Sequence, residues 1–173
     1  MNFEIRAATP EDDEAILAVN AEGIPGVSPL DSVKLSRLAA AADPLLVAVE
    51  GARVAAYLIA FQPAADYEGA CFLWFRERHP RSLYIDQVAV GAAWRRSGAA
   101  SALYDALAAI ASKRGLEELT CEVNIDPPNP QSMRFHQVQG FRAVGDITVP
   151  DGRTVSLQVR ALGSRVADTA TRP

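Results

Sequence analysis

Short runs of alternating apolar and polar residues divide the chain into candidate strands, and longer runs with helical spacing lie between them. A period of two is typical of a half-buried strand, whereas apolar residues at i, i+4 and i+7 predict a helix. The order of these elements, with neither repeats nor a linker, predicts a single α/β domain. Strands are expected at residues 3–8, twice within 45–61, at 83–90, at 116–125 and twice within 141–160, and helices at 9–22, 31–43, 99–115 and 129–140.

Two segments fall outside this regular pattern. Residues 62–81 have neither period and predict a long irregular connection, a kind of segment that is often functional. Residues 161–173, "ALGSRVADTATRP", have little apolar surface to bury and predict a flexible tail. The expected domain therefore covers residues 1–160.

Composition and charge narrow the class of protein. The chain has 173 residues, 49% apolar and 22% charged, which is ordinary for a soluble globular protein. A net charge of −4 gives no basic footprint for nucleic acid, and no apolar run approaches the ~20 residues that span a bilayer. Cys71 and Cys121 have no CxxC pair or histidine cluster nearby, so neither a metal site nor a disulfide framework is expected. The N-terminal segment is acidic and unlike a signal peptide. Together these features predict a cytoplasmic protein without nucleic-acid or membrane partners.

The segment "WRRSGAAS", Trp94–Ser101, places Arg95 and Arg96 at the start of a predicted helix, where cations are unfavourable. The first amide N–H groups of a helix have no intrahelical partners and commonly bind a phosphate. Gly98 lets the backbone approach such an anion closely, and both arginines would pair with it. The alternative is a capped helix with two surface arginines. Neither a P-loop nor a GxGxxG fingerprint is present.

Two motifs resemble those of the GNAT superfamily of N-acetyltransferases. Arg95-Arg96-Ser97-Gly98-Ala99-Ala100 resembles the acetyl-CoA motif Arg/Gln-x-x-Gly-x-Gly/Ala. The segment "NPQSMRFHQVQGF" resembles Asn-x-x-Ala/Ser-x-x-Phe-Tyr-x-x-x-Gly-Phe, with His136 at the Tyr position. The resemblance covers residues 3–160 and implies a mixed, mostly antiparallel sheet of about seven strands flanked by four helices.

The resemblance also implies acetyl-CoA as cosubstrate, no metal, and direct acetyl transfer to the primary amine of a small molecule or peptide. Many relatives form homodimers. A non-catalytic acetyl-CoA-binding sensor is the alternative, since it needs the same anion site without an acid or a base. The cofactor-binding residues implied are Val88, Ala89, Val90, Arg95, Arg96, Ser97, Gly98, Ala99, Ala100, Ser101, Asn129, Ser132 and Phe135.

Acetyl transfer poses two proton problems, because the ammonium must lose a proton and the leaving thiolate must gain one. His136, in the place of the family's Tyr, would have to act as an imidazolium. The alternative is a histidine that packs beside Phe135 or touches the substrate without transferring a proton. Glu122 is the first candidate base, and alternation places it on one strand face with Asn124, with Cys121 on the other.

Asp86 is the second candidate base. By alternation it shares a face with Tyr84 and Val88 in an apolar strand, where an unpaired acid is costly. Either carboxylate could instead orient the substrate ammonium. Tyr84, Asn124 and Trp74 are the expected acceptor-binding residues, and core packing explains Trp74 about as well.

Overall fold

The computed structural model describes residues 2–163 and contains one seven-stranded sheet with the strand order β1-β2-β3-β4-β5-β7-β6. Every neighbouring pair of strands is antiparallel except β4 and β5, which are parallel. The mostly antiparallel seven-stranded sheet predicted above is therefore confirmed. The strands are β1 (Glu4–Ala7), β2 (Leu45–Glu50), β3 (Arg53–Phe61), β4 (Ser82–Val90), β5 (Glu118–Asp126), β6 (Arg142–Thr148) and β7 (Thr154–Ala161).

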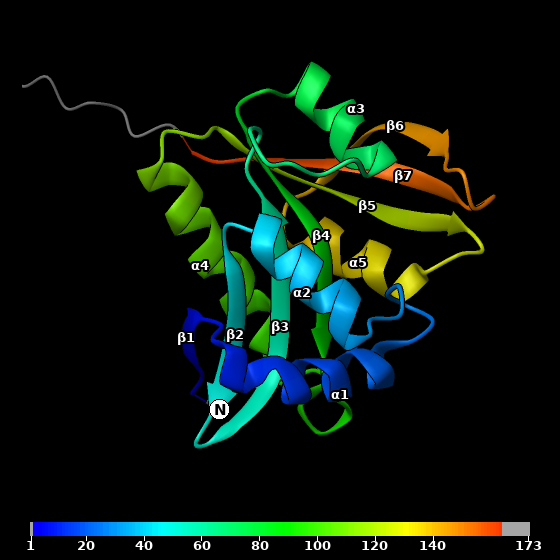
Figure 1. Ribbon diagram of the computed structural model, residues 1–173. Helices are drawn as coiled ribbons and strands as arrows, with labels where there is room; N and C mark the ends of the chain where they lie inside the picture. The colour runs from blue at the N-terminus through cyan, green and yellow to red at the C-terminus, as the bar shows by residue number, and fades with distance from the viewer. Residues whose placement is uncertain (1, 164–173) are drawn as a thin grey trace, which may run out of the picture.

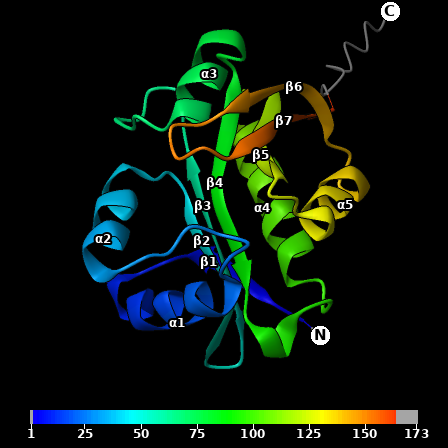
Figure 2. The same ribbon diagram turned by 90° about the vertical axis from the view of Figure 1, so that its right-hand side faces the viewer.

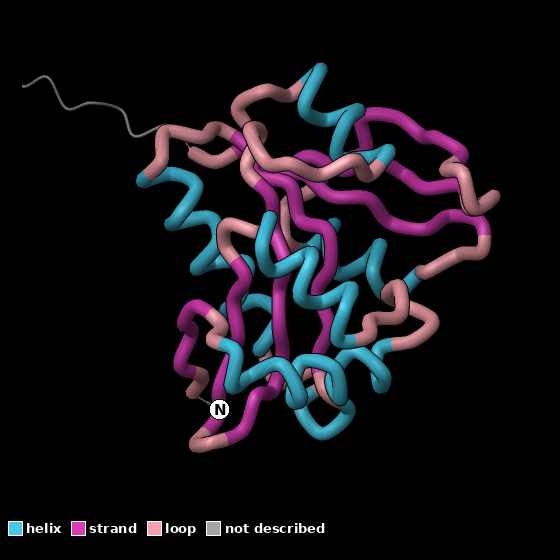
Figure 3. Tube along the Cα trace, viewed as in Figure 1, coloured by secondary structure: helices cyan, strands magenta, loops and turns pink. Residues whose placement is uncertain are grey.

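Helices cover both faces of this sheet (Figures 1 and 3). One face carries a hydrophobic cluster with residues of α1, α2 and α3, and the other a cluster with residues of α4 and α5. Figure 2 shows α1 and α2 on one side of β3 and β4, with α4 and α5 on the other. The helices are α1 (Asp13–Gly23), α2 (Ser32–Ala41), α3 (Ala70–Arg78), α4 (Ala99–Lys113) and α5 (Pro130–Val138), with short 3-10 turns at Pro10–Asp12 and Ala92–Trp94.

The four predicted helices form close to their expected bounds, but the structure adds a fifth. Helix α3 lies within residues 62–81, which were expected to be irregular, so the prediction of four helices was wrong. Its buried residues Cys71, Phe72 and Phe75 follow the i, i+1, i+4 spacing of a helix and pack on the α1–α2 face. The run "CFLWF" hid this spacing, because every one of its residues is apolar.

The end of the described chain extends past the expected boundary at residue 160. Strand β7 ends at Ala161, and the backbone N–H of Leu162 donates to the carbonyl of Glu117. The first residues of the predicted tail thus belong to the packed fold. Residues 164–173 lie outside the described part of the chain.

Candidate active site

The two central strands separate part-way along the sheet. The ladder between β4 and β5 ends at the pair Ile85 and Cys121, whereas β4 stays paired with β3 as far as Val90. Asp86 and Glu122 are therefore register-equivalent residues at the first unpaired step. Figure 1 shows β4 and β5 diverging beyond this point.

Asp86 is the extra residue of a β-bulge, because Ile85 and Gln87 pair with consecutive residues of β3. A bulge reverses the alternation that follows it, and bulges often re-aim side chains at functional sites. Val88 accordingly packs on the α4–α5 face, whereas Tyr84 packs on the α1–α2 face. The prediction that Asp86 and Tyr84 share a face with Val88 was wrong, because it assumed an unbroken strand.

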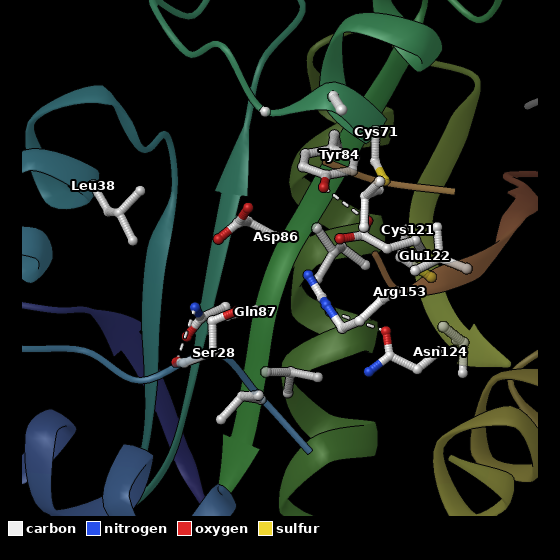
Figure 4. Close-up of a pocket in the computed structure, with 18 of the residues that line it drawn as sticks. Ser28, Leu38, Cys71, Tyr84, Asp86, Gln87, Cys121, Glu122, Asn124 and Arg153 are labelled. Carbon is white, nitrogen blue, oxygen red and sulfur yellow. Dashed lines mark hydrogen bonds between the residues drawn. The ribbon is translucent and has the colours of Figure 1, made fainter. Parts of the chain in front are cut away.

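An open cavity of about 1460 Å³ occupies the separation between the strands. It exceeds the roughly 300–1,000 Å³ of a typical small-molecule site, so it has room for two reactants side by side. Its lining comes from α2, which includes the cations Lys34 and Arg37, from the α1–α2 connection, from residues 66–71, from β4, β5 and α5, from Tyr104 on α4, and from the β6–β7 turn. Figure 4 shows the side chains that meet in it.

Glu122 carries a partly buried carboxyl group in this cavity. The hydroxyl of Tyr84 donates to its Oε2 at 2.7 Å. Burial raises the pKa of Glu122 to about 8, the charge of nearby Asp86 adds to the shift, and the Tyr84 bond and Arg153 oppose it. A carboxyl group with this pKa can both hold and release a proton near neutral pH, as a general base requires.

Asp86 faces the same cavity and is held by Tyr67, whose hydroxyl donates to its Oδ1 at 2.6 Å. Burial also raises the pKa of Asp86, against the effect of this hydrogen bond. Tyr67 in turn stacks on Phe61 with ring centroids 4.2 Å apart. The structure therefore brings both candidate carboxylates into one site and gives each a tyrosine partner.

Arg153, from the β6–β7 turn, lines the same cavity, and sequence reasoning missed it. Its Nη1 donates to Oδ1 of Asn124 at 2.9 Å, and its Nη2 lies 2.8 Å from Oδ2 of Asp151. In Figure 4 its guanidinium lies between Glu122 and Asn124. The sequence contained only a weak signal, an arginine directly after the turn "PDG".

The two cysteines lie on opposite faces of the sheet. Cys71 lines the cavity from α3, and burial raises the pKa of its thiol, which disfavours the reactive thiolate. Cys121 packs in the α4–α5 cluster, as the alternation of β5 predicts.

The start of α4 has free backbone donors. Gly98 is the N-cap residue with φ +93°, and Arg96, with φ +62°, is the one non-glycine residue at positive φ among residues 2–163. Strain of this kind often marks a functional site. Within the same residues, the backbone N–H groups of Gly98, Ala100 and Ser101 have no acceptor. They form a ready anion-binding site at the positive end of the helix.

The two arginines of this segment differ in their contacts. Nη2 of Arg95 donates to the carbonyl of Glu22 at 2.6 Å, so Arg95 fastens the segment to the end of α1. This contact occupies part of the guanidinium that the sequence interpretation assigned to the anion. Arg96 is exposed and has no hydrogen-bond acceptor among the described residues.

His136 lines the cavity but is buried, with 4% of its surface exposed. Its Nδ1 lies 2.8 Å from the carbonyl oxygen of Ser132, which can only accept, so Nδ1 carries the hydrogen. Its Nε2 lies 2.8 Å from the hydroxyl of Tyr104 and accepts from it when the ring is neutral. Burial lowers the pKa of His136. The burial of His136 favours a neutral imidazole and argues against the imidazolium that a general-acid role requires.

The other α5 residues differ in their relation to the cavity. Asn129 is the N-cap residue, and its Oδ1 accepts from the backbone N–H of Ser132 at 3.1 Å. Both residues also line the cavity. Phe135 instead packs edge-on against Tyr104, with ring centroids 5.2 Å apart.

Trp74 does not line the cavity, so the structure gives no support to its predicted role in binding the acceptor. It lies on α3, contacts Phe75 edge-on, and has the guanidinium of Arg78 above its ring at 4.8 Å. The other two expected acceptor residues, Tyr84 and Asn124, do line the cavity.

The family model of the Acetyltransferase (GNAT) family matches residues 21–141. This chain belongs to the GNAT acetyltransferase family. Members of the family are acyl-CoA-dependent N-acyltransferases. No curated protein sequence matches the chain.

Solved structures agree with the GNAT fold. Ard1 from Thermoplasma volcanium has a TM-score of 0.76 at 18% identity, covering 95% of this chain and 100% of its own. The ribosomal-protein-S18-alanine N-acetyltransferase from Escherichia coli has a TM-score of 0.72 at 14% identity, covering 96% of this chain and 98% of its own. The yncA protein from Salmonella typhimurium, solved with its cofactor acetyl-CoA, has a TM-score of 0.66 at 18% identity, covering 98% of this chain and 99% of its own. At these identities the likeness shows the fold.

The residues of this GNAT protein fit acetyl-CoA. Its pyrophosphate is the kind of anion that the unpaired amides of Gly98, Ala100 and Ser101 bind, and Arg96 adds a free cation beside them. Within residues 2–163, no three His, Cys, Asp or Glu side chains converge as a metal site would need. No helix in the same range is long and apolar enough to cross a membrane.

Proposed function

We propose that this protein is an N-acetyltransferase that transfers the acetyl group of acetyl-CoA directly to the primary amine of a small molecule or peptide. One observation carries the proposal: the carboxyl group of Glu122, with its pKa raised to about 8, faces the cavity at the separation of β4 and β5. A titratable group with a strongly shifted pKa in a cleft is typical of catalytic sites.

Glu122 is the base in this proposal. An alkylammonium, with a pKa of about 10, must lose a proton before its nitrogen can attack. Ionised Glu122 accepts that proton directly or through one water molecule, and the raised pKa makes it a better base than an ordinary carboxylate. Asp86, across the separation, holds the ammonium close through its negative charge.

Acetyl-CoA, when bound, supplies the acetyl group as an activated thioester. Free backbone N–H groups within Arg96–Ser101, those of Gly98, Ala100 and Ser101, hold its pyrophosphate, and Asn129 and Ser132 line its path along α5. The strand segment Val88–Val90 contributes backbone groups that bind the pantetheine arm and polarise the thioester carbonyl. A donor aimed at a developing oxyanion is commonly worth ~3 kcal/mol.

We assign His136 a positioning role in place of the general-acid role suggested by the family's Tyr. Its neutral ring accepts from Tyr104 on α4 and donates to Ser132 on α5, so it joins the two helices beside the cavity. The substitution of His136 for the family's Tyr remains part of the proposal.

Release of free CoA thiol from acetyl-CoA, screened against amines, amino acids and short peptides, tests the proposal. Strong release with one amine class, together with mass-spectrometric detection of the acetylated amine, supports the N-acetyltransferase. Binding of acetyl-CoA without turnover on any amine would favour the sensor. The cytoplasmic location and the homodimer stay predictions.

A further inference from the structure

Arg153 has unused hydrogen-bond donors in the cavity. A guanidinium has five N–H groups. Nε donates to Asp151, Nη2 lies 2.8 Å from Oδ2 of Asp151 in an ion pair, and one N–H of Nη1 is donated to Asn124. At least one donor therefore remains on each terminal nitrogen, and two such donors match the two oxygens of a carboxylate.

The position of Arg153 is fixed from both sides. Asn124 holds it from β5, and Asp151 holds it from its own turn. The side chain of Asp151 is 56% exposed, so water and salt screen its charge and leave Arg153 available to a second anion.

Arg153 lies next to the proposed base. Glu122 and Asn124 are two residues apart on one face of β5, and Arg153 is bonded to Asn124. Among residues 2–163, Glu122 and Arg153 form no ion pair with each other, although both line the cavity. A carboxyl group that can bind an ammonium therefore lies beside a guanidinium that can bind a carboxylate, and the two groups are not paired with each other.

We propose that the acceptor is a free α-amino acid, whose amino group lies at Glu122 and whose carboxylate is bound by Arg153. In an α-amino acid the two charged groups are attached to one carbon, which suits a base and a guanidinium on neighbouring positions. Amines without a carboxylate leave Arg153 without its second anion. The inference rests on the proposed acetyl transfer and names its substrate class.

The test compares kcat/KM for the 20 free amino acids with kcat/KM for their carboxamides and for the corresponding amines that lack the carboxylate. We expect at least one amino acid to exceed both of its analogues by about 10- to 100-fold, the worth of hydrogen bonds between charged groups. Arg153→Gln should lower kcat/KM for that amino acid by a similar factor beyond its effect on the simple amine, since loss of Arg153 also raises the pKa of Glu122 with either substrate. Arg153→Lys keeps the charge but loses the paired donors. Its kcat/KM for that amino acid should fall between the values for wild type and Arg153→Gln.

Arg142→Gln is the matched control, because Arg142 is exposed on the neighbouring strand β6 and lies outside the cavity. Thermal unfolding of each variant checks that it folds. If amides or simple amines react as well as amino acids, or if Arg153→Gln keeps the preference, the amino-acid assignment fails while acetyl transfer stands. If acetyl-CoA binds and no amine of any class reacts, the proposed function fails as well.

Discussion

Asp86 on β4 and Glu122 on β5 face one cavity from register-equivalent positions, one step beyond the last hydrogen-bonded pair of their strands. The parallel pairing of these strands brings the two carboxylates together, and the bulge in β4 turns Asp86 toward the cavity. The charge of Asp86 contributes to the raised pKa of Glu122. One carboxylate therefore adds to the effect of burial on the pH at which the other can accept a proton.

Replacing Asp86 tests this dependence. Asp86→Asn removes a neighbouring negative charge, which favours ionised Glu122 and lowers its pKa. We expect the pH at half-maximal kcat/KM to move to lower pH by roughly one unit. Asp66→Asn, which removes an exposed carboxylate from the cavity rim, is the control and should leave the profile in place. An unmoved profile in Asp86→Asn would show that the two carboxylates do not interact.

Gly98 tests the anion site. Gly98→Glu places a negative side chain at the proposed pyrophosphate site and strains a residue at φ +93°, so we expect the acetyl-CoA dissociation constant to rise at least about 30-fold. Gly115→Glu makes the same change at φ +74°, just beyond the opposite end of α4. Both variants should lose about 1–2 kcal/mol of stability. Calorimetry showing equal loss of affinity in both would contradict the assignment.

His136 should behave as a neutral positioning residue. His136→Gln leaves the buried Tyr104 hydroxyl with a poorer partner, so we expect a loss of about 1–3 kcal/mol of stability. We also expect wild-type kcat to show no fall as pH rises through about 6.5, since the imidazolium is already disfavoured. If kcat falls across that range and His136→Gln removes the fall, His136 is the general acid after all.

Glu122 should also limit stability in alkaline solution. Its pKa is about 8 in the folded protein and 4.5 when unperturbed, so the folded state holds the extra proton between these values. Stability contributed by this group is complete below pH 4.5 and lost as pH rises through 8. Glu122→Gln should therefore gain in unfolding temperature relative to wild type between pH 5 and pH 9, by at least about 3 °C. A difference that does not change with pH would contradict the raised pKa.

Much of the fold was predictable because local rules decide it. The caps and apolar spacing of α4 and the alternation of β5 gave the correct elements and placed Glu122 on the cavity side. Effects that arise only in the folded chain were not predictable. The bulge at Asp86 depends on pairing with β3, and the Tyr104–His136 bond joins residues that are 32 positions apart.

Arg153 and Trp74 illustrate the same limit for the site. Arg153 enters the cavity from a turn whose position depends on the β5–β7 pairing, so no local pattern marked it. Trp74 looked like an acceptor residue because its segment seemed irregular, but α3 turns it toward Phe75 and Arg78. Local patterns therefore predicted which strands hold the carboxylates, and packing decided their partners.

The most direct test of the account is the pH dependence of kcat/KM for wild type and Glu122→Gln with the same amine. We predict that wild-type kcat/KM rises with pH through about 8, and that the variant loses this rise together with roughly 100- to 10,000-fold of activity. Ionisation of the amine itself affects both proteins equally, so the difference between the profiles isolates Glu122. A variant that keeps the wild-type profile and activity within about threefold would contradict Glu122 as the base.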